Sequence, residues 1–216
     1  GEDRGRVRRE RRHNGRRNRR TERENEIENE RENERRVRAE KKEREIVTWN
    51  VQRMSLREHN RRRMRRVIEK IVKKGWEIVL MSEISADGEG VLWLGEDEER
   101  VAVIHSRKSA VVLRGEALEL WVNEGQKRWF DERVTAVVFG GMRLVAVYQP
   151  VWGTDADGME RYRRAVESQV AMNGSEKLII GGDFNASVGR GNDREGVSGR
   201  YGLGRANEAG RDLSDW

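Results

Sequence analysis

The chain has 216 residues, of which 39% are charged and only 35% are hydrophobic. It contains no cysteine, which excludes disulfide frameworks, thiolate zinc sites and cysteine nucleophiles. The net charge of +6 is unevenly distributed, because residues 1–45 carry 18 basic and 13 acidic side chains whereas residues 46–216 carry 27 and 26.

Residues 1–45 form a charged segment of low complexity. Only four apolar side chains occur there, too few to offset the conformational entropy that ordering would cost. We therefore predict a disordered or fraying-helical tail. The basic run from Arg8 to Arg20 leaves a second interpretation open, in which the tail contacts RNA or DNA or directs nuclear import.

Residues 46–216 are enough for one domain with a core. Residues 46–51 are rich in β-branched and aromatic side chains, which predicts a strand. Apolar residues at helical spacing, including Met64, Val67 and Ile71, predict a helix within residues 56–74 that ends at Gly75. The apolar run at 78–81 predicts a strand covered on both faces, so the three elements form a βαβ unit with parallel strands.

The sequence pattern after residue 90 predicts short strands and further helices. Gly140 and Gly141 form the two-residue turn of a predicted hairpin. The expected strands cover 91–94, 101–105, 110–113, 118–122, 134–139, 142–148 and 178–180, and the expected helices cover 157–172 and the start of a helix at 207–216. This mixture predicts an α/β fold with two packed mixed sheets and outer helices.

No apolar stretch approaches the roughly 20 residues of a membrane span, and the Arg-rich N-terminus is no secretory signal. We therefore expect a nuclear or cytoplasmic protein without membrane contact. The chain begins with Gly1 instead of Met and stops at Trp216 within a patterned segment. We expect a fragment of a longer protein.

Polar residues follow four of the predicted apolar strands, namely Asn50, Glu83, Tyr148, and Asp183 with Asn185. One such residue is usually a turn residue or a helix cap, but four at strand ends favour a ligand site. Mg²⁺ prefers one or two carboxylates and completes its shell with water and phosphate oxygens. The pattern favours metal-assisted phosphoester hydrolysis, with Glu83 as the metal carboxylate and Asp183 as general base or water-orienting group.

The same residues carry a family resemblance. The segments 47–50 (Val-Thr-Trp-Asn), 81–83, 145–150 and 180–185 (Ile-Gly-Gly-Asp-Phe-Asn) resemble, in order, the motifs of the endonuclease/exonuclease/phosphatase superfamily, which includes deoxyribonuclease I and the apurinic-type endonucleases. Residues 149–153 and 199–213 resemble endonuclease domains of non-LTR (LINE-type) retrotransposons.

The resemblance implies a four-layer α/β sandwich, incomplete at its C-terminus, that uses Mg²⁺ or Mn²⁺ to nick DNA. It implies that Glu83 is the metal ligand and that Asn50 is its neighbour on the metal or phosphate. Tyr148 would contact the scissile phosphate, Asp183 would position or activate the nucleophile, and Asn185 would hold the phosphate.

In the resembled superfamily, a Ser-Asp-His motif near the C-terminus carries an essential histidine. None of His13, His59 and His105 matches it, so we expect this chain alone to be inactive. Two other interpretations stay open. One is a branch that acts as a phosphatase or phospholipase. The other is a non-catalytic remnant that binds nucleic acid through the basic tail.

Overall fold

A computed structural model of the chain describes residues 44–57, 61–96, 99–172, 174–189 and 204–215. The prediction of a tail over residues 1–45 therefore lies almost wholly outside the described residues. The described elements, in chain order, are β1 (Ile46–Ser55), α2 (Arg61–Lys74), β2 (Ile78–Ser85), β3 (Gly90–Leu94), β4 (Val101–His105), β5 (Ser109–Arg114), α3 (Gly115–Asn123), β6 (Arg128–Asp131), β7 (Val134–Phe139), β8 (Met142–Tyr148), α4 (Ala156–Ala171), β9 (Lys177–Asp183) and α5 (Glu208–Asp215).

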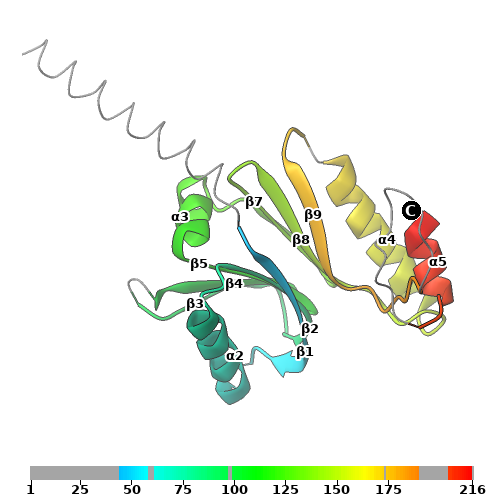
Figure 1. Ribbon diagram of the computed structural model, residues 1–216, viewed down its shortest axis with the longest axis horizontal. Helices are drawn as coiled ribbons and strands as arrows, with labels where there is room; N and C mark the ends of the chain where they lie inside the picture. The colour runs from blue at the N-terminus through cyan, green and yellow to red at the C-terminus, as the bar shows by residue number, and fades with distance from the viewer. Residues whose placement is uncertain (1–43, 58–60, 97–98, 173, 190–203, 216) are drawn as a thin grey trace, which may run out of the picture. The chain divides into compact units, whose positions relative to one another are not determined.

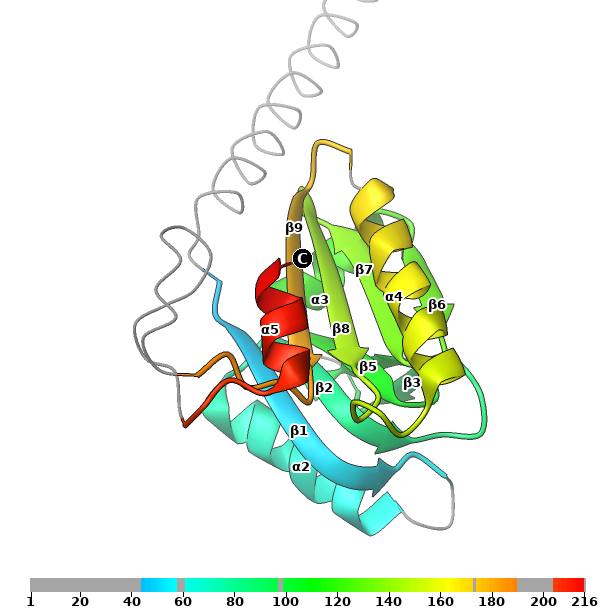
Figure 2. The same ribbon diagram turned by 90° about the vertical axis from the view of Figure 1, so that its right-hand side faces the viewer.

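The strands form two mixed sheets (Figures 1 and 2). The first sheet has the order β1-β2-β5-β4-β3 and the second has the order β6-β7-β8-β9. Each sheet has one parallel pair, β1 with β2 and β8 with β9, and a helix connects the two strands of each pair. The predicted βαβ unit is thus confirmed.

Three apolar clusters show that the fold has four layers. One cluster joins α2 to the outer face of the first sheet, and another joins α4 to the outer face of the second sheet. The third lies between the two sheets, where Leu80, Leu144 and Phe139 are fully buried. The predicted four-layer α/β sandwich is therefore confirmed for the described residues.

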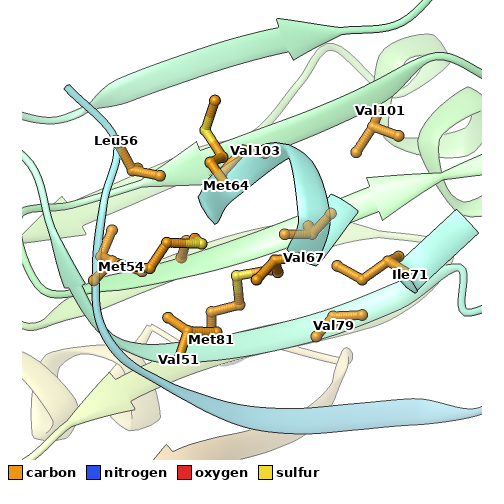
Figure 3. Packing of buried hydrophobic residues seen from close by; sticks show 13 residues of the cluster. Val51, Met54, Leu56, Met64, Val67, Ile71, Val79, Met81, Val101 and Val103 are labelled. Carbon is orange, nitrogen blue, oxygen red and sulfur yellow. The ribbon is translucent and has the colours of Figure 1, made fainter. Parts of the chain in front are cut away.

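Helix α2 covers the first sheet through the apolar stripe that the sequence predicted. Met64, Val67 and Ile71 point from the helix toward Val79 and Met81 of β2 (Figure 3). Burying each of these side chains contributes about 1.5–3 kcal/mol. The helix ends where predicted, because Gly75 has a φ of +72° and the N–H of Trp76 donates to the carbonyl of Ile71 at 3.2 Å.

The hairpin between β7 and β8 also has the predicted turn. Phe139 pairs with Met142, so Gly140 and Gly141 are the two central residues of the turn. Their φ angles of +55° and +69° are those that a type I′ turn requires.

The expected strand at 118–122 is wrong, because these residues belong to helix α3. Ala117, Leu118 and Trp121 are buried on one side of that helix, and the indole N–H of Trp121 donates to the carbonyl of Lys127 at 3.0 Å. A short apolar run does not distinguish a strand from a buried helix segment, and here the helical spacing of Ala117 and Trp121 decides.

Smaller differences concern element bounds and exposure. Strand β6 was not predicted, and α2 is described from Arg61 onward instead of from residue 56. Trp93 on β3 is 38% exposed. No helix among the described residues has the length and the apolar content needed to cross a membrane.

Candidate active site

Pairing of the parallel strands brings the predicted site residues to neighbouring strand ends. Asn50 on β1 pairs with Ser82 on β2, so Glu83 follows on the adjacent strand. In the second sheet, Tyr148 on β8 pairs with Asp183 on β9. The carboxyl ends of the strands are where α/β folds place ligands.

A side-chain hydrogen bond between β1 and β9 joins the two sheets at this end. The side-chain amide of Asn50 donates to Oδ2 of Asp183 at 2.5 Å, although the two residues are 133 positions apart. The backbone N–H of Asn185 donates to Oδ1 of the same carboxylate at 2.9 Å. Both oxygens of Asp183 therefore accept a hydrogen bond, which fixes the orientation of the carboxylate.

Two glycines before Asp183 allow β9 to lie close to the first sheet and to the neighbouring strand β8. A Cβ at Gly181 would lie 2.7 Å from the Leu80 side chain and 2.9 Å from that of Thr48, both in the first sheet. Gly182 has a φ of +148°, and a Cβ there would collide with the backbone of Val147 on β8. These contacts explain why the chain carries Gly-Gly before the aspartate.

Asn185 ties the ends of β8 and β9 together. Its side-chain amide donates to the carbonyl of Gln149 at 2.6 Å, and the N–H of Gln149 donates to the carbonyl of Asp183 at 2.9 Å. Asn207 holds the next part of the loop, because its Oδ1 accepts from the N–H groups of Ser187 and Gly210 at 3.0 and 2.7 Å. This capping side chain fixes the start of α5.

Glu83 and Tyr148 line a cleft of about 610 Å³. The other three predicted residues, Asn50, Asp183 and Asn185, are not part of its lining and form the hydrogen-bonded group described above. Strand pairing connects the two groups, because Tyr148 pairs with Asp183 and Asn50 pairs with the residue before Glu83. The Glu83 side chain is 22% exposed, so its carboxylate can be reached from the cleft.

Four cationic side chains, none of them predicted as site residues, also line this cleft. They are Arg53, Arg57, Lys108 and Arg133. Arg53 Nε lies 3.6 Å from Glu83 Oε1, and the Arg133 guanidinium lies over the Tyr148 ring, 5.5 Å from its centroid. Basic residues are so frequent in this sequence that their positions alone did not indicate which of them line a site. A cleft with this lining suits a polyanionic ligand.

Buried hydroxyl groups tie the turn between β4 and β5, which carries Lys108, to β7 of the second sheet. Ser109 Oγ and Thr135 Oγ1 lie 3.0 Å apart, and Thr135 Oγ1 accepts from the N–H of Ser106 at 3.0 Å. Between the two serines, the N–H of Lys108 donates to the carbonyl of Glu132, and its carbonyl accepts from the N–H of Ile84. The backbone of Lys108 is thus fixed beside Glu83.

The backbone at the strand ends is strained. Gln52, Arg53, Glu83 and Asn185 have φ angles of +49°, +59°, +61° and +45°. Among the described residues, the only other non-glycine residue with a positive φ is Gln126. Such conformations concentrate at functional sites, where the surrounding structure holds them in place.

His105 is a structural residue. It is buried at the end of β4, and its Nδ1 lies 3.1 Å from the carbonyl oxygen of Ser106. Burial lowers the pKa of the imidazole, and hydrogen bonds with backbone groups and the charge of Glu89 oppose this effect. His13 and His59 lie outside the described residues.

The residues present fit an open site for a divalent cation. The described part of the chain holds no cluster of three or more Asp, Glu or His side chains that could enclose a metal. Glu83 is an accessible carboxylate in a cleft that has space for phosphate, and Mg²⁺ prefers such a site because it binds one or two carboxylates and keeps several waters. Asn50 Oδ1 accepts one hydrogen bond, from the N–H of Gln52 at 2.8 Å, and retains a second lone pair.

Comparison with known families agrees with the sequence motifs. A model of the Endonuclease/Exonuclease/phosphatase family matches residues 47–212. The chain therefore belongs to this family, and the predicted superfamily is confirmed. Membership supports a hydrolase of the phosphodiesterase type. A search of the curated proteins finds no match.

Two solved structures are similar to part of the chain. One is a 3'-5' exonuclease (NExo) from Neisseria meningitidis, with 21% sequence identity and a TM-score of 0.40 over 67% of this chain and 59% of that chain. The other is the 3' phosphatase NExo from Neisseria bound to a product DNA hairpin, with 18% identity and a TM-score of 0.38 over 66% and 58%. The chain thus spans less than two thirds of the length of either.

Proposed function

We propose that the chain is a divalent-metal-dependent phosphodiester hydrolase that acts on DNA. The observation that carries the proposal is the hydrogen bond between Asn50 and Asp183, which joins the two sheets beside a cleft lined by Glu83 and by cations. Carboxylate, amide and cationic groups at one site suit a phosphate diester with a divalent ion. DNA as the substrate is supported by the sequence resemblance to endonucleases.

Each predicted residue has a role that its contacts allow. Glu83, with Asn50 as its neighbour, would hold Mg²⁺ or Mn²⁺, and the bound ion would neutralise charge on the phosphate oxygens. Asp183, oriented by Asn50, accepts a proton from the attacking water or orients it. The Tyr148 hydroxyl would donate a hydrogen bond to a phosphate oxygen beside Arg133.

The Asn185 side-chain amide has one N–H group that bonds to no described residue and could serve the substrate. One of its two amide N–H groups is used by the carbonyl of Gln149, so the other holds a phosphate oxygen. The positive φ of Asn185 and its backbone bond to Asp183 fix the side chain next to the carboxylate. The residue proposed to bind the phosphate therefore also fixes the carboxylate proposed to orient the nucleophile.

We further propose that the chain is the DNA endonuclease domain of a retroelement polyprotein. The support is the resemblance of residues 149–153 and 199–213 to LINE-type endonuclease domains. Residues 204–213 of the second segment are described, and there Asn207 connects the loop after Asp183 to α5. An endonuclease nicks a covalently closed circle, whereas an exonuclease needs an end.

The first test uses an aryl phosphodiester, bis(p-nitrophenyl) phosphate, with Mn²⁺. Its leaving group departs without a general acid, so the assay does not depend on a catalytic histidine. We expect metal-dependent hydrolysis that falls about 10²–10⁴-fold in Glu83→Gln and in Asp183→Asn. Glu89→Gln, an exposed carboxylate nearby, is the matched control and should keep full activity. No metal-dependent hydrolysis, or equal activity in all variants, would favour the non-catalytic alternative.

Nicking of DNA by the 216-residue chain is the second test. We predict that nicking of a supercoiled plasmid is absent or slowed by about 10²–10⁴-fold, because none of the three histidines matches the catalytic histidine of the resembled motif. Rapid Mg²⁺-dependent nicking by this chain would show that the prediction of inactivity is wrong.

A further inference from the structure

The positive charge of the folded domain is concentrated on one helix. Residues 46–216 contain 27 basic and 26 acidic side chains, and α2 alone contains eight of the basic and one of the acidic ones. The remainder of residues 46–216 therefore holds 19 basic and 25 acidic side chains, a net charge of −6. Helix α2, with a net charge of +7, stands out against an acidic background.

Three basic side chains of α2, together with the exposed acidic residue Glu69, face away from the first sheet. At 100° per residue, Arg62, Arg66 and Lys73 fall within about 40° of each other, opposite the buried Met64 and Ile71. All three are exposed. We call these three residues the α2 stripe. It extends over about 16 Å of the helix axis.

The stripe has no protein partner in the described part of the chain. Two other cations of α2 do have one, since Lys70 lies over the Trp49 ring and Arg63 Nη2 donates to the carbonyl of Val51 at 3.0 Å. Arg62, Arg66 and Lys73 make no ion pair with any described residue. Their charge is available to a ligand from outside.

The placement of the charge also opposes the helix itself. The N-terminal end of a helix carries a partial positive charge, so a cation in the first turn costs about 0.3–1 kcal/mol. Helix α2 has no acidic residue in its first turn and begins Arg61-Arg62-Arg63. Helix α4 follows the usual rule, with Asp155 as its N-cap and Asp157 in its first turn. The unfavourable arrangement in α2 points to a use for these arginines other than helix stability.

We infer that the α2 stripe is a binding surface for the phosphate backbone of nucleic acid, separate from the cleft. A row of cations that form no ion pair with the described residues complements a polyphosphate backbone. Insertion into a lipid surface does not fit, because the apolar face of α2 is buried against the first sheet.

The first turn of α2 lies beside the strand that leads to the cleft. The bond from Arg63 to Val51 places the first turn of α2 beside the C-terminal half of β1, and Figure 2 shows the helix alongside this strand. Arg53 and Arg57, which follow on the chain, line the cleft. We infer that a nucleic-acid backbone leaving the cleft passes the cations on α2. Binding here does not depend on hydrolysis.

The test measures binding of the 216-residue chain to a DNA duplex of about 30 base pairs in EDTA, between about 50 and 200 mM salt. The slope of log K against log[salt] is negative, and each lost phosphate contact reduces the magnitude of this slope by about 0.9. We expect Arg62→Gln/Arg66→Gln/Lys73→Gln to reduce the magnitude of the slope by two to three units and to weaken binding at least tenfold at the lowest salt. The tail is present in every variant, so its contribution is constant.

The matched control is Arg161→Gln/Lys177→Gln/Arg205→Gln, which removes the same charge from exposed positions elsewhere. We expect it to change the slope by less than one unit. Equal changes in both triple variants, or no change in the α2 variant, would overturn the inference, as would an effect seen only with vesicles of anionic lipid. Thermal unfolding should show little change in stability in the α2 variant, because the unfavourable charge lost from its first turn offsets the favourable charge lost with Lys73 in its last turn. If that variant does not fold, Arg62→Gln alone should reduce the magnitude of the slope by about 0.9.

Discussion

The interior of the sandwich and the strand ends that form the candidate site differ in how they use the backbone, and strand β2 passes through both. Residues 78–81 are fully buried and pair regularly with both β1 and β5. Directly beyond Ser82, Glu83 adopts a φ of +61°, and the register of β1 shifts between Asn50 and Met54. The comparison teaches that an apolar, regular interior supplies the stability that allows a strained, polar strand end.

The largest expected effect is on the interior side. Phe139 is fully buried between the two sheets, so Phe139→Ala should lower the free energy of unfolding by about 3–5 kcal/mol. Urea denaturation measures this change. Val122→Ala, at a position that is 37% exposed, is the control and should stay within about 0.5 kcal/mol. A loss below about 1 kcal/mol for Phe139→Ala would mean that the interior is not the main source of stability.

The strand-end side should show the opposite sign. A left-handed conformation costs a non-glycine residue about 1–2 kcal/mol, and glycine loses about 0.5–1 kcal/mol through its greater freedom when unfolded. Glu83→Gly should therefore raise the free energy of unfolding by about 0.5–1 kcal/mol while it abolishes hydrolysis.

Gln126→Gly is the matched control for this substitution. Gln126 has a φ of +54° but lies after α3, where its N–H donates to the carbonyl of Trp121. It should gain similar stability with unchanged activity. If Glu83→Gly instead lowers the free energy of unfolding, backbone strain does not distinguish the strand ends from the interior.

The smallest effect concerns His105, which lies where the interior meets the strand end. Burial lowers the pKa of His105 below its ordinary value of 6.5, so the unfolded chain binds the proton more readily than the folded one. Stability from the neutral imidazole is present above pH 6.5 and is lost as the pH falls through the folded pKa.

Urea denaturation of the wild-type chain and of His105→Gln, at about pH 7.5 and about pH 5.5, measures this contribution. The wild type should lose more stability between the two pH values than the variant does. Identical losses would show that His105 is not proton-linked to folding.

Much of the fold could be predicted from the sequence because local patterns agreed with long-range packing. The period of Met64, Val67 and Ile71 specified the buried face of α2, and Gly140-Gly141 specified a turn. The strand predicted at 118–122 failed because a five-residue apolar run carries no reliable period, and the helix is set by packing of Trp121 between the sheets.

The candidate site was predictable only in part. Polar residues after apolar strands indicated which strand ends to compare, and parallel pairing accounts for the proximity of Asn50 to Ser82 and of Tyr148 to Asp183. The bond between Asn50 and Asp183 depends on how the two sheets pack, which no local pattern encodes. Positive φ angles at Glu83 and Asn185 are likewise invisible in a sequence without glycine at those positions. The catalytic roles of these residues stay predictions.

The central claim is that the strand ends bind a divalent cation at Glu83 beside a phosphate. Anomalous diffraction from crystals of the chain grown with Mn²⁺ and a deoxynucleoside monophosphate tests this claim most directly. We predict a manganese peak within coordination distance of the Glu83 carboxylate, with the phosphate on the same ion, and no such peak in Glu83→Gln. A peak at another carboxylate, with Glu83 free of metal, would contradict the account.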